Sequence, residues 1–114
     1  IHLRRALHPK AATPLDEPLL AEIEQTVANH KIVVYSKSWC PFCARTLATL
    51  ADLALEPHVV DLDELDNGAE IQMALAVKTG QRTVPNVFVN AAHLGGNDDT
   101  QRAARSGALQ QMLS

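Results

Sequence analysis

The chain has 114 residues, of which 46% are hydrophobic, and a formal net charge of −3. This length accommodates one small domain with a modest core and at most a terminal extension. The slightly acidic balance gives no electrostatic reason to expect binding to nucleic acid or to an anionic membrane. No apolar run approaches the roughly 18 residues that a membrane-spanning helix requires.

The first 18 residues differ in composition from the rest of the chain. They are basic, contain no acid before Asp16, hold prolines at positions 9, 14 and 18, and show no apolar periodicity. We therefore expect a disordered or processed extension over residues 1–18 and a single domain over residues 19–114. The start at Ile1 and the acid-free beginning also resemble the end of an organelle transit peptide. Two sparse cysteines suit a reducing compartment, so the cytoplasm is expected, with a plastid or mitochondrion as the alternative.

Helices and strands are expected to alternate along the remaining chain. Helices are predicted where apolar residues recur at helical spacing, and strands where β-branched and apolar residues cluster. The expected helices cover residues 19–30, 40–55, 69–78 and a final segment from about 98, and the expected strands cover 31–36, 57–63, 84–89 and 93–94. Strand, helix and strand between residues 31 and 63 predict a βαβ unit with parallel strands. The sum is an α/β domain with a mixed sheet of about four strands and helices on both faces.

Cys40 and Cys43 are the only cysteines, and they stand where the first predicted strand gives way to a helix. Backbone N–H groups in a first helical turn lack internal partners and carry partial positive charge, which stabilises a thiolate. Pro41 fits the first helical position, where its missing N–H is not needed. We therefore expect Cys40 to cap the helix as an exposed thiol of low pKa. The nearby Lys37 and Arg45 should lower that pKa further.

Cys43 is expected to be the more buried of the two thiols. It shares one helical face with Leu47, Leu50 and Ala54, and this apolar face should point to the core. One exposed, activated sulfur and one shielded partner suit thiol–disulfide exchange, in which the first attacks and the second resolves the mixed disulfide. A purely structural disulfide is a poor interpretation, because the loop that it would close is very short.

Four features, taken in order, resemble a dithiol glutaredoxin over roughly residues 19–113. They are Cys40-Pro41-Phe42-Cys43 preceded by Lys37, the helix carrying Gln72, Thr83-Val84-Pro85, and Gly95-Gly96-Asn97-Asp98-Asp99. The resemblance implies a thioredoxin-like fold and a glutathione-dependent thiol–disulfide oxidoreductase that reduces protein–glutathione mixed disulfides and protein disulfides. It implies glutathione as the co-substrate, glutathionylated or disulfide-containing proteins as partners, and a monomer.

The resemblance also implies a glutathione-binding groove. Cys40 and Cys43 would be the catalytic thiols, and Cys40 would take up the glutathionyl sulfur as a mixed disulfide. A cis bond before Pro85 would turn the backbone of Val84 outward, so that it pairs with the cysteinyl part of glutathione. The complete binding set implied is Lys37, Cys40, Phe42, Gln72, Arg82, Thr83, Val84, Pro85, Gly96, Asp98 and Asp99.

The two ends of glutathione are assigned different partners by this resemblance. Its glycine carboxylate would meet Lys37, Gln72 and Arg82 through charge and hydrogen bonds. The γ-glutamyl carboxylate would lie on free N–H groups at the start of the last helix, with the ammonium near Asp99. Asp98 stands where a hydroxyl residue is expected in many relatives, and it would repel the glutamyl carboxylate unless it turns away.

Other interpretations of the cysteine pair remain open. A structural zinc site needs four ligands, and the sequence has no second Cys or His pair at ligand spacing. An iron–sulfur cluster bridging two subunits needs only thiolates, although Pro41 stiffens the loop against it. A thioredoxin-type reductase served by a flavoenzyme would lack a glutathione groove. No metal is therefore expected, and a bridging cluster is kept as the alternative.

Overall fold

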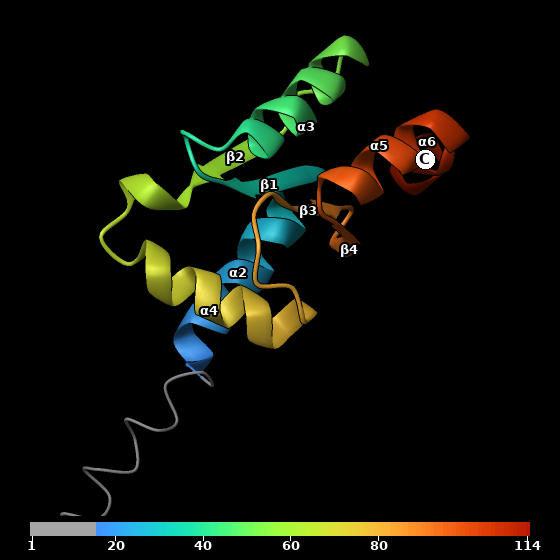
Figure 1. The fold of residues 1–114 in the computed structure, drawn as a ribbon. Helices are drawn as coiled ribbons and strands as arrows, with labels where there is room; N and C mark the ends of the chain where they lie inside the picture. The colour runs from blue at the N-terminus through green and yellow to red at the C-terminus, as the bar shows by residue number, and fades with distance from the viewer. Residues whose placement is uncertain (1–15) are drawn as a thin grey trace, which may run out of the picture.

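A four-stranded sheet is the middle layer of the part of the chain that the computed structural model describes, residues 16–114 (Figure 1). The strands are β1 (Ile32–Ser36), β2 (His58–Asp61), β3 (Asn86–Val89) and β4 (Ala92–Gly95), in the spatial order β2-β1-β3-β4. β1 pairs with β2 in parallel, and β3 is antiparallel to both β1 and β4. The mixed sheet and its parallel pair confirm the predictions from the strand pattern.

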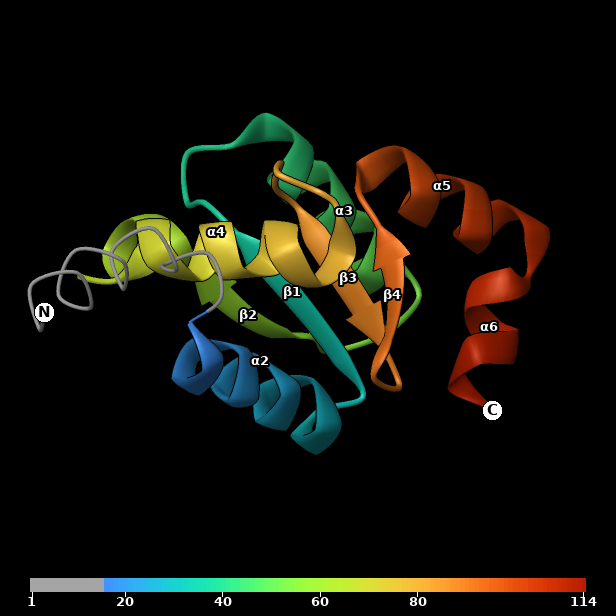
Figure 2. The ribbon, with the colours of Figure 1, turned by 90° about the horizontal axis from the view of Figure 1, so that it is seen from below.

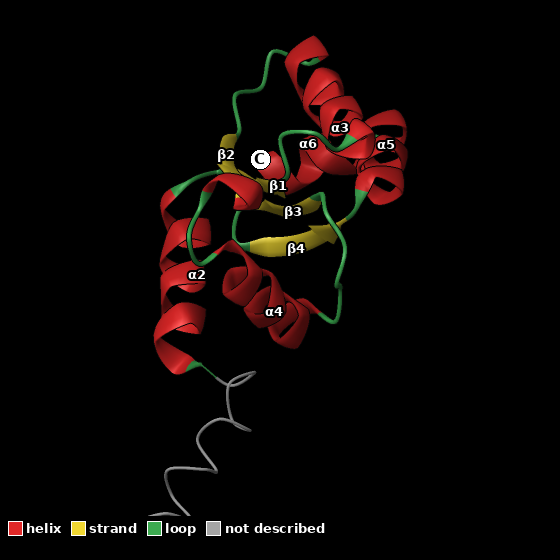
Figure 3. Cartoon of the chain, turned by 60° about the vertical axis from the view of Figure 1, so that its left-hand side comes forward, coloured by secondary structure: helices red, strands yellow, loops and turns green. Residues whose placement is uncertain are grey.

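Helices cover both faces of this sheet, as Figures 2 and 3 show. The helices are α2 (Glu17–Asn29) and α4 (Gly68–Thr79) on one face and α3 (Pro41–Asp52), α5 (Asn97–Ser106) and α6 (Ala108–Leu113) on the other. A short 3-10 helix, η2 (Leu62–Glu64), connects β2 to α4. The connection from β1 to α3 therefore lies at the end of the sheet, where Cys40 stands.

The central strand β1 is buried along its whole length, because helices cover the sheet on both sides. Side chains alternate between the faces of a strand, so β1 contributes to two apolar clusters. Val33 and Tyr35 pack with Phe88 under α2 and α4, whereas Ile32 and Val34 pack under α3, α5 and α6. Each such fully buried side chain stabilises the fold by roughly 1.5–3 kcal/mol. The strand that leads into the loop before Cys40 is thus fixed from both sides.

Helix α2 begins at Glu17, two residues earlier than the sequence pattern predicts. Asp16 caps it by accepting a hydrogen bond from the Leu19 N–H at 3.2 Å, and Pro18 occupies the first turn, where a proline is tolerated. The predicted extension falls mainly on residues 1–15, which lie outside the described residues. The domain boundary therefore stays a prediction.

The final helix is two helices rather than one. Gly107 has a φ of 86°, and this left-handed backbone ends α5 before α6 starts. Other elements occur as predicted but differ at their ends. The helix α3 ends at Asp52, β2 is shorter, and β3 starts at Asn86, after the proline.

Candidate active site

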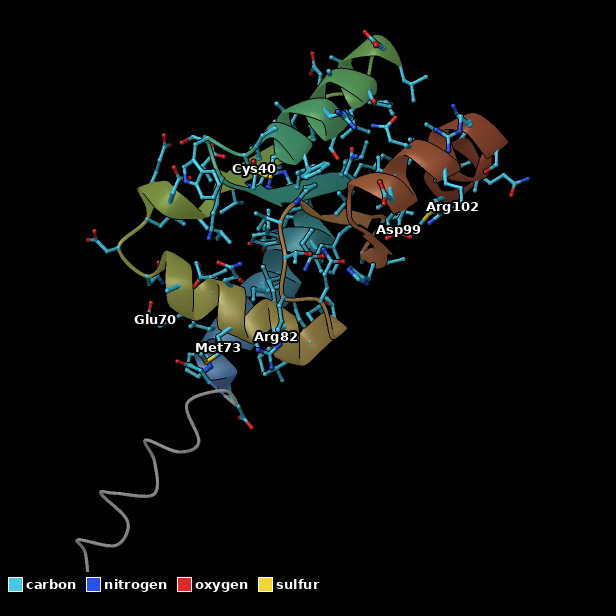
Figure 4. The ribbon with its side chains drawn as sticks, in the orientation of Figure 1. Cys40, Glu70, Met73, Arg82, Asp99 and Arg102 are labelled. Atoms are coloured by element: carbon cyan, nitrogen blue, oxygen red, sulfur yellow. The ribbon has the colours of Figure 1, made fainter. Side chains whose placement is uncertain are left out.

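Cys40 is the N-cap residue of α3, directly after the loop that leaves β1. Its Sγ accepts a hydrogen bond from the Cys43 N–H, with a sulfur–nitrogen distance of 3.4 Å. The same Sγ lies 4.0 Å from the carbonyl oxygen of Val84, in the loop before β3. Both thiols are free, so the structure holds the dithiol form. In Figure 4, Cys40 lies at the end of α3 that faces this loop.

The prediction that Cys40 is exposed is wrong, whereas the burial of Cys43 is confirmed. Only 8% of Cys40 and 1% of Cys43 are accessible. The capping geometry turns the Cys40 thiol inward, toward the Cys43 N–H and the Val84 carbonyl. Its chain neighbour Trp39 and the nearby Phe42 are instead exposed, at 68% and 55%. The aromatic side chains near Cys40 are thus exposed, whereas its sulfur is buried.

The two thiols have opposite pKa shifts. Burial raises the pKa of Cys40. Hydrogen bonds from Cys43 and from the Phe42 N–H outweigh this effect, and together with the positive charge of Lys37 they lower the pKa below the ordinary thiol value. Burial raises the pKa of Cys43, hydrogen bonds from Ser36 and the Lys37 backbone offset this only in part, and the neighbouring Cys40 raises it further. Cys40 is therefore the thiol that ionises first.

Each exposed aromatic ring lies close to a cation. The Nζ of Lys37 is 5.7 Å from the centre of the Trp39 ring, and the guanidinium carbon of Arg45 is 5.7 Å from that of Phe42. Lys37 lowers the Cys40 pKa as predicted. The guanidinium of Arg45, for which the same effect was expected, lies over the Phe42 ring.

A cavity of about 500 Å³ lies between α3, the loop before β3 and the start of α5. It is lined by Phe42, Gln81, Thr83, Val84, Pro85, Gly96, Asn97, Asp98 and Asp99. Most of the sequence-predicted binding set therefore comes together here, from three separate segments. Gln81 and Asn97 are lining residues that the sequence reasoning missed.

Gln81 fixes the loop before β3 through its side-chain amide. Its Nε2 donates hydrogen bonds to the carbonyl oxygens of Thr83, at 3.1 Å, and Pro85, at 2.9 Å. The Val84–Pro85 peptide bond is cis, as the family resemblance implies. In the sequence, only the nearness of Gln81 to Thr83 pointed to this contact. Because polar residues beside a loop usually face solvent, that signal was too weak to predict it.

The start of α5 forms the opposite wall of the cavity. Asp99 Oδ2 accepts a hydrogen bond from the Gly96 N–H at 3.0 Å, and its Oδ1 pairs with Arg102 at 3.0 Å. The hydrogen bond from the Gly96 N–H holds the pKa of Asp99 below its usual range, and Arg102 has a smaller effect in the same direction. Figure 4 shows Asp99 and Arg102 together on α5. Asp98 is exposed at the same wall.

Buried polar contacts join this wall to the cysteine-bearing helix. Asn97 is only 6% exposed, and its Oδ1 accepts hydrogen bonds from Thr46 Oγ1 at 2.9 Å and from Gln101 Nε2 at 3.1 Å. Thr46 lies one turn beyond Cys43 on α3 and is fully buried. The two helices that border the cavity are thus held together by a satisfied polar network.

Known proteins similar to this chain share one family. The Glutaredoxin family model matches residues 32–94, more than half of the chain. Glutaredoxin-C4 of Arabidopsis thaliana is 47% identical over 91 residues, covering 80% of this chain and 67% of that protein. "Glutaredoxin-C4, chloroplastic" of Oryza sativa subsp. japonica is 43% identical over 111 residues, covering 93% and 84%. A crystal structure of a buckwheat glutaredoxin–glutathione complex superposes with a TM-score of 0.82 at 38% identity, covering 85% of this chain and 88% of that one.

The chain belongs to the glutaredoxin family. It is a glutathione-dependent thiol–disulfide oxidoreductase with a thioredoxin-like fold. The predictions of family, fold and activity class are thereby confirmed. The roles of the individual residues stay predictions.

Two predicted binding residues of this glutaredoxin line a second cavity, of about 630 Å³, along α4. They are Gln72 and Arg82, and Gln72 Nε2 donates a hydrogen bond to the Arg82 carbonyl oxygen at 2.9 Å. The apolar part of this cavity includes Met73 and Val77, which are 50% and 42% exposed. Figure 4 shows Arg82 and Met73 on the α4 side, apart from Asp99. Neither Lys37 nor Cys40 is among the residues that line these two cavities, although Cys40 Sγ lies 4.0 Å from the Val84 carbonyl oxygen.

Residues 16–114 contain no group of three or more His, Cys, Asp or Glu side chains placed to hold a metal ion. Within the same range, no helix is long and apolar enough to span a membrane.

Proposed function

We propose that this glutaredoxin reduces protein–glutathione mixed disulfides with Cys40 as the nucleophile, and binds glutathione in the 500 Å³ cavity. The observation that carries the proposal is the position of Cys40 Sγ, 3.4 Å from the Cys43 nitrogen and 4.0 Å from the Val84 carbonyl oxygen at the edge of that cavity. A thiolate at this point is stabilised by the helix start and faces the loop that would hold the peptide backbone of glutathione.

The reaction requires two exchanges at Cys40. The Cys40 thiolate attacks the glutathione sulfur of the mixed disulfide, a new sulfur–sulfur bond forms, and the substrate leaves as a thiolate that takes a proton from solvent. The thiolate of a second glutathione then attacks the glutathionyl sulfur. The Cys40 thiolate is released together with oxidised glutathione. Because the pKa of Cys40 is lowered, Cys40 is also a good leaving group in this second step.

Cys43 is proposed to resolve mixed disulfides with protein substrates. Its thiol attacks Cys40 Sγ, the substrate leaves as a thiolate, and an intramolecular disulfide forms that glutathione later reduces. Since burial raises the pKa of Cys43, its proton must pass to the departing substrate thiolate or to solvent as it attacks, and this route is expected to be slower than attack by free glutathione. The mixed disulfide with glutathione can therefore be turned over without Cys43.

The cavity offers separate partners for the parts of glutathione. The Val84 backbone would pair with the cysteinyl part, beside Thr83, Pro85 and Phe42. The first N–H groups of α5, which follow Gly96, would bind the glutamyl carboxylate, and Asp99 offers a negative charge to the ammonium. A buckwheat glutaredoxin that superposes on this chain was crystallised as a glutathione complex, which supports glutathione as the ligand.

The glycine carboxylate is assigned to cations outside the 500 Å³ cavity. Arg82 is exposed, and Gln72 is held against its backbone, so both could contact a carboxylate that extends past Thr83. Lys37 supplies positive charge from the Cys40 side. Asp98, exposed at the α5 start, is proposed to point away from the glutamyl carboxylate.

We further propose that the protein acts as a monomer on glutathionylated or disulfide-containing proteins in the cytoplasm. A plastid or mitochondrion is the alternative, and a relative in rice is chloroplastic by its name.

The test is glutathione-coupled reduction of a small mixed disulfide by the wild type, Cys40→Ser and Cys43→Ser. Activity should vanish in Cys40→Ser and persist in Cys43→Ser. An inactive wild type, or an active Cys40→Ser variant, would refute the proposed mechanism.

A further inference from the structure

The loop between β1 and Cys40 is attached to a carboxylate from another part of the chain. Asp63 Oδ1 accepts a hydrogen bond from the Ser38 N–H at 2.9 Å, and Asp63 Oδ2 accepts one from the Ser38 hydroxyl. Ser38 lies within a turn that the Cys40 N–H closes by donating to the Lys37 carbonyl oxygen at 3.1 Å. The carboxylate thus holds the turn whose last residue is Cys40.

These contacts continue the pairing of β1 with β2 beyond the end of the sheet. The parallel register ends with Ser36 opposite Asp61, and Ser38 and Asp63 each follow two residues later. At that point the chain leaves β2 and forms η2. The Asp63 side chain supplies the acceptor, since an N–H at a strand end needs a partner or water.

Charge connects the same residues to the nucleophile. The two hydrogen bonds from Ser38 lower the pKa of Asp63, and the charge of Lys37 lowers it further. Lys37 also lowers the pKa of Cys40 and lies over the Trp39 ring. Lys37 is therefore shared between a carboxylate that fixes the loop and the thiolate that the loop positions.

We propose that Asp63 is a positioning residue for the redox reaction: through Ser38 it fixes the turn that places Lys37 and the Cys40 thiol at the start of α3. This inference rests on the proposed role of Cys40 as the nucleophile. Asp63 acts through hydrogen-bond geometry rather than through its charge. A negative charge near Cys40 by itself disfavours the thiolate, so its removal alone would help ionisation.

The test compares Asp63→Ala, Asp63→Asn and Asp66→Ala in the full chain. Asparagine keeps an acceptor for the Ser38 N–H and replaces the second oxygen with an NH2 group that can donate to the Ser38 hydroxyl, so both contacts survive without the charge. Alanine loses both hydrogen bonds. Asp66 is an exposed carboxylate close in sequence, so its removal changes the net charge equally. The readouts are the rate of Cys40 alkylation by iodoacetamide as a function of pH, with the modified residue identified by mass spectrometry, and kcat/KM for a small mixed disulfide.

We expect Asp63→Ala to lower both rates at neutral pH about fivefold and to move the alkylation profile to higher pH, because misplacement of a reacting group is costly. Asp63→Asn should stay within about twofold of the wild type, and Asp66→Ala should match it. If Asp63→Ala does not fold, as judged by circular dichroism, Ser38→Ala replaces it and should shift the profile in the same direction.

Wild-type profiles for the alanine variant would overturn the inference, as would an equal defect in Asp63→Asn or Asp66→Ala. These outcomes differ from failure of the proposed function. If the proposed function is wrong, iodoacetamide will not modify Cys40 first, or the Cys40→Ser variant will stay active, regardless of the results with the Asp63 variants.

Discussion

The backbone N–H of Cys43 donates to the sulfur of Cys40, 3.4 Å away, while the thiol of Cys43 is itself almost fully buried. One residue therefore stabilises the charge of the nucleophile with its amide and keeps its own sulfur protonated through burial. The helix geometry explains this pairing, because an N-cap side chain accepts from the N–H two or three residues further on. The two cysteines acquire different chemistry from one turn of helix.

The pH dependence of alkylation should separate the two thiols. The folded-state pKa of Cys40 is lowered, so its thiolate persists to lower pH than in an unfolded chain and is lost as the pH falls through the lowered value. The pKa of Cys43 is raised, so its thiolate forms only at higher pH. Iodoacetamide at neutral pH should therefore modify Cys40 alone, as peptide mass mapping can show. Equal modification of both thiols would contradict the assignment.

Substitution of Gln81 should weaken glutathione binding. Gln81→Glu replaces the donor to the Thr83 and Pro85 carbonyl oxygens with a carboxylate that repels both of them. We expect the Kd for glutathione, measured by calorimetry on a Cys40→Ser background, to rise about tenfold. This rise corresponds to the free energy of about one hydrogen bond. Gln81→Ala should show a smaller rise. Gln110→Glu on α6 is the control of equal charge, and a similar rise there would show that charge alone acts.

The polar network between α3 and α5 should be coupled energetically. Thr46→Val removes the hydroxyl that donates to Asn97, and we expect it to lower the free energy of unfolding by about 1 kcal/mol. Asn97→Ala leaves the buried Thr46 hydroxyl without its acceptor and should lower the free energy of unfolding by about 2 kcal/mol. The double variant should cost less than the sum of the two, as urea denaturation can measure. Strict additivity would mean that the contact contributes nothing.

The sequence predicted where most helices and strands lie, because they depend on local patterns of residues. The apolar run of β1, the proline after Cys40 and the Gly80 helix end each act within a few residues. The burial of Cys40 could not be read in this way, since it depends on the Val84 carbonyl, which is 44 residues away. Asp63 and Asn97 were missed for the same reason. Each is an ordinary polar residue until the fold places Ser38 or Thr46 opposite it.

The family resemblance predicted a glutathione-binding groove, but it did not distinguish the residues that line the 500 Å³ cavity from those that lie outside it. Thr83, Val84 and Pro85 do line the 500 Å³ cavity, whereas Gln72 and Arg82 line the second one. Arg82 and Thr83 are neighbours in the chain, yet Arg82 lines the cavity along α4, together with the exposed Met73 and Val77, and Thr83 lines the other. Motif order along the chain carries no information about such neighbours in space.

Gly68 should tolerate substitution poorly, because backbone atoms occupy the space that a side chain would need. A Cβ at this position would overlap the backbone oxygen of Leu62, which belongs to η2 and cannot move without disturbing the start of α4. We expect Gly68→Ala to lower the free energy of unfolding by about 3 kcal/mol or more, as for overpacking against a rigid neighbour. Chemical denaturation monitored by circular dichroism measures this loss.

The matched comparison is Gly80→Ala, at the other end of the same helix. Gly80 has a φ of 79°, and no atom lies within 4 Å of the position that an alanine methyl group would take, so only the backbone conformation opposes an alanine there. That strain should cost about 1 kcal/mol. The order of the two losses separates steric contact from backbone preference. If Gly80→Ala proves the more destabilising, then η2 must yield to the new methyl group, and the close approach of η2 to α4 is not what fixes residue 68 as glycine.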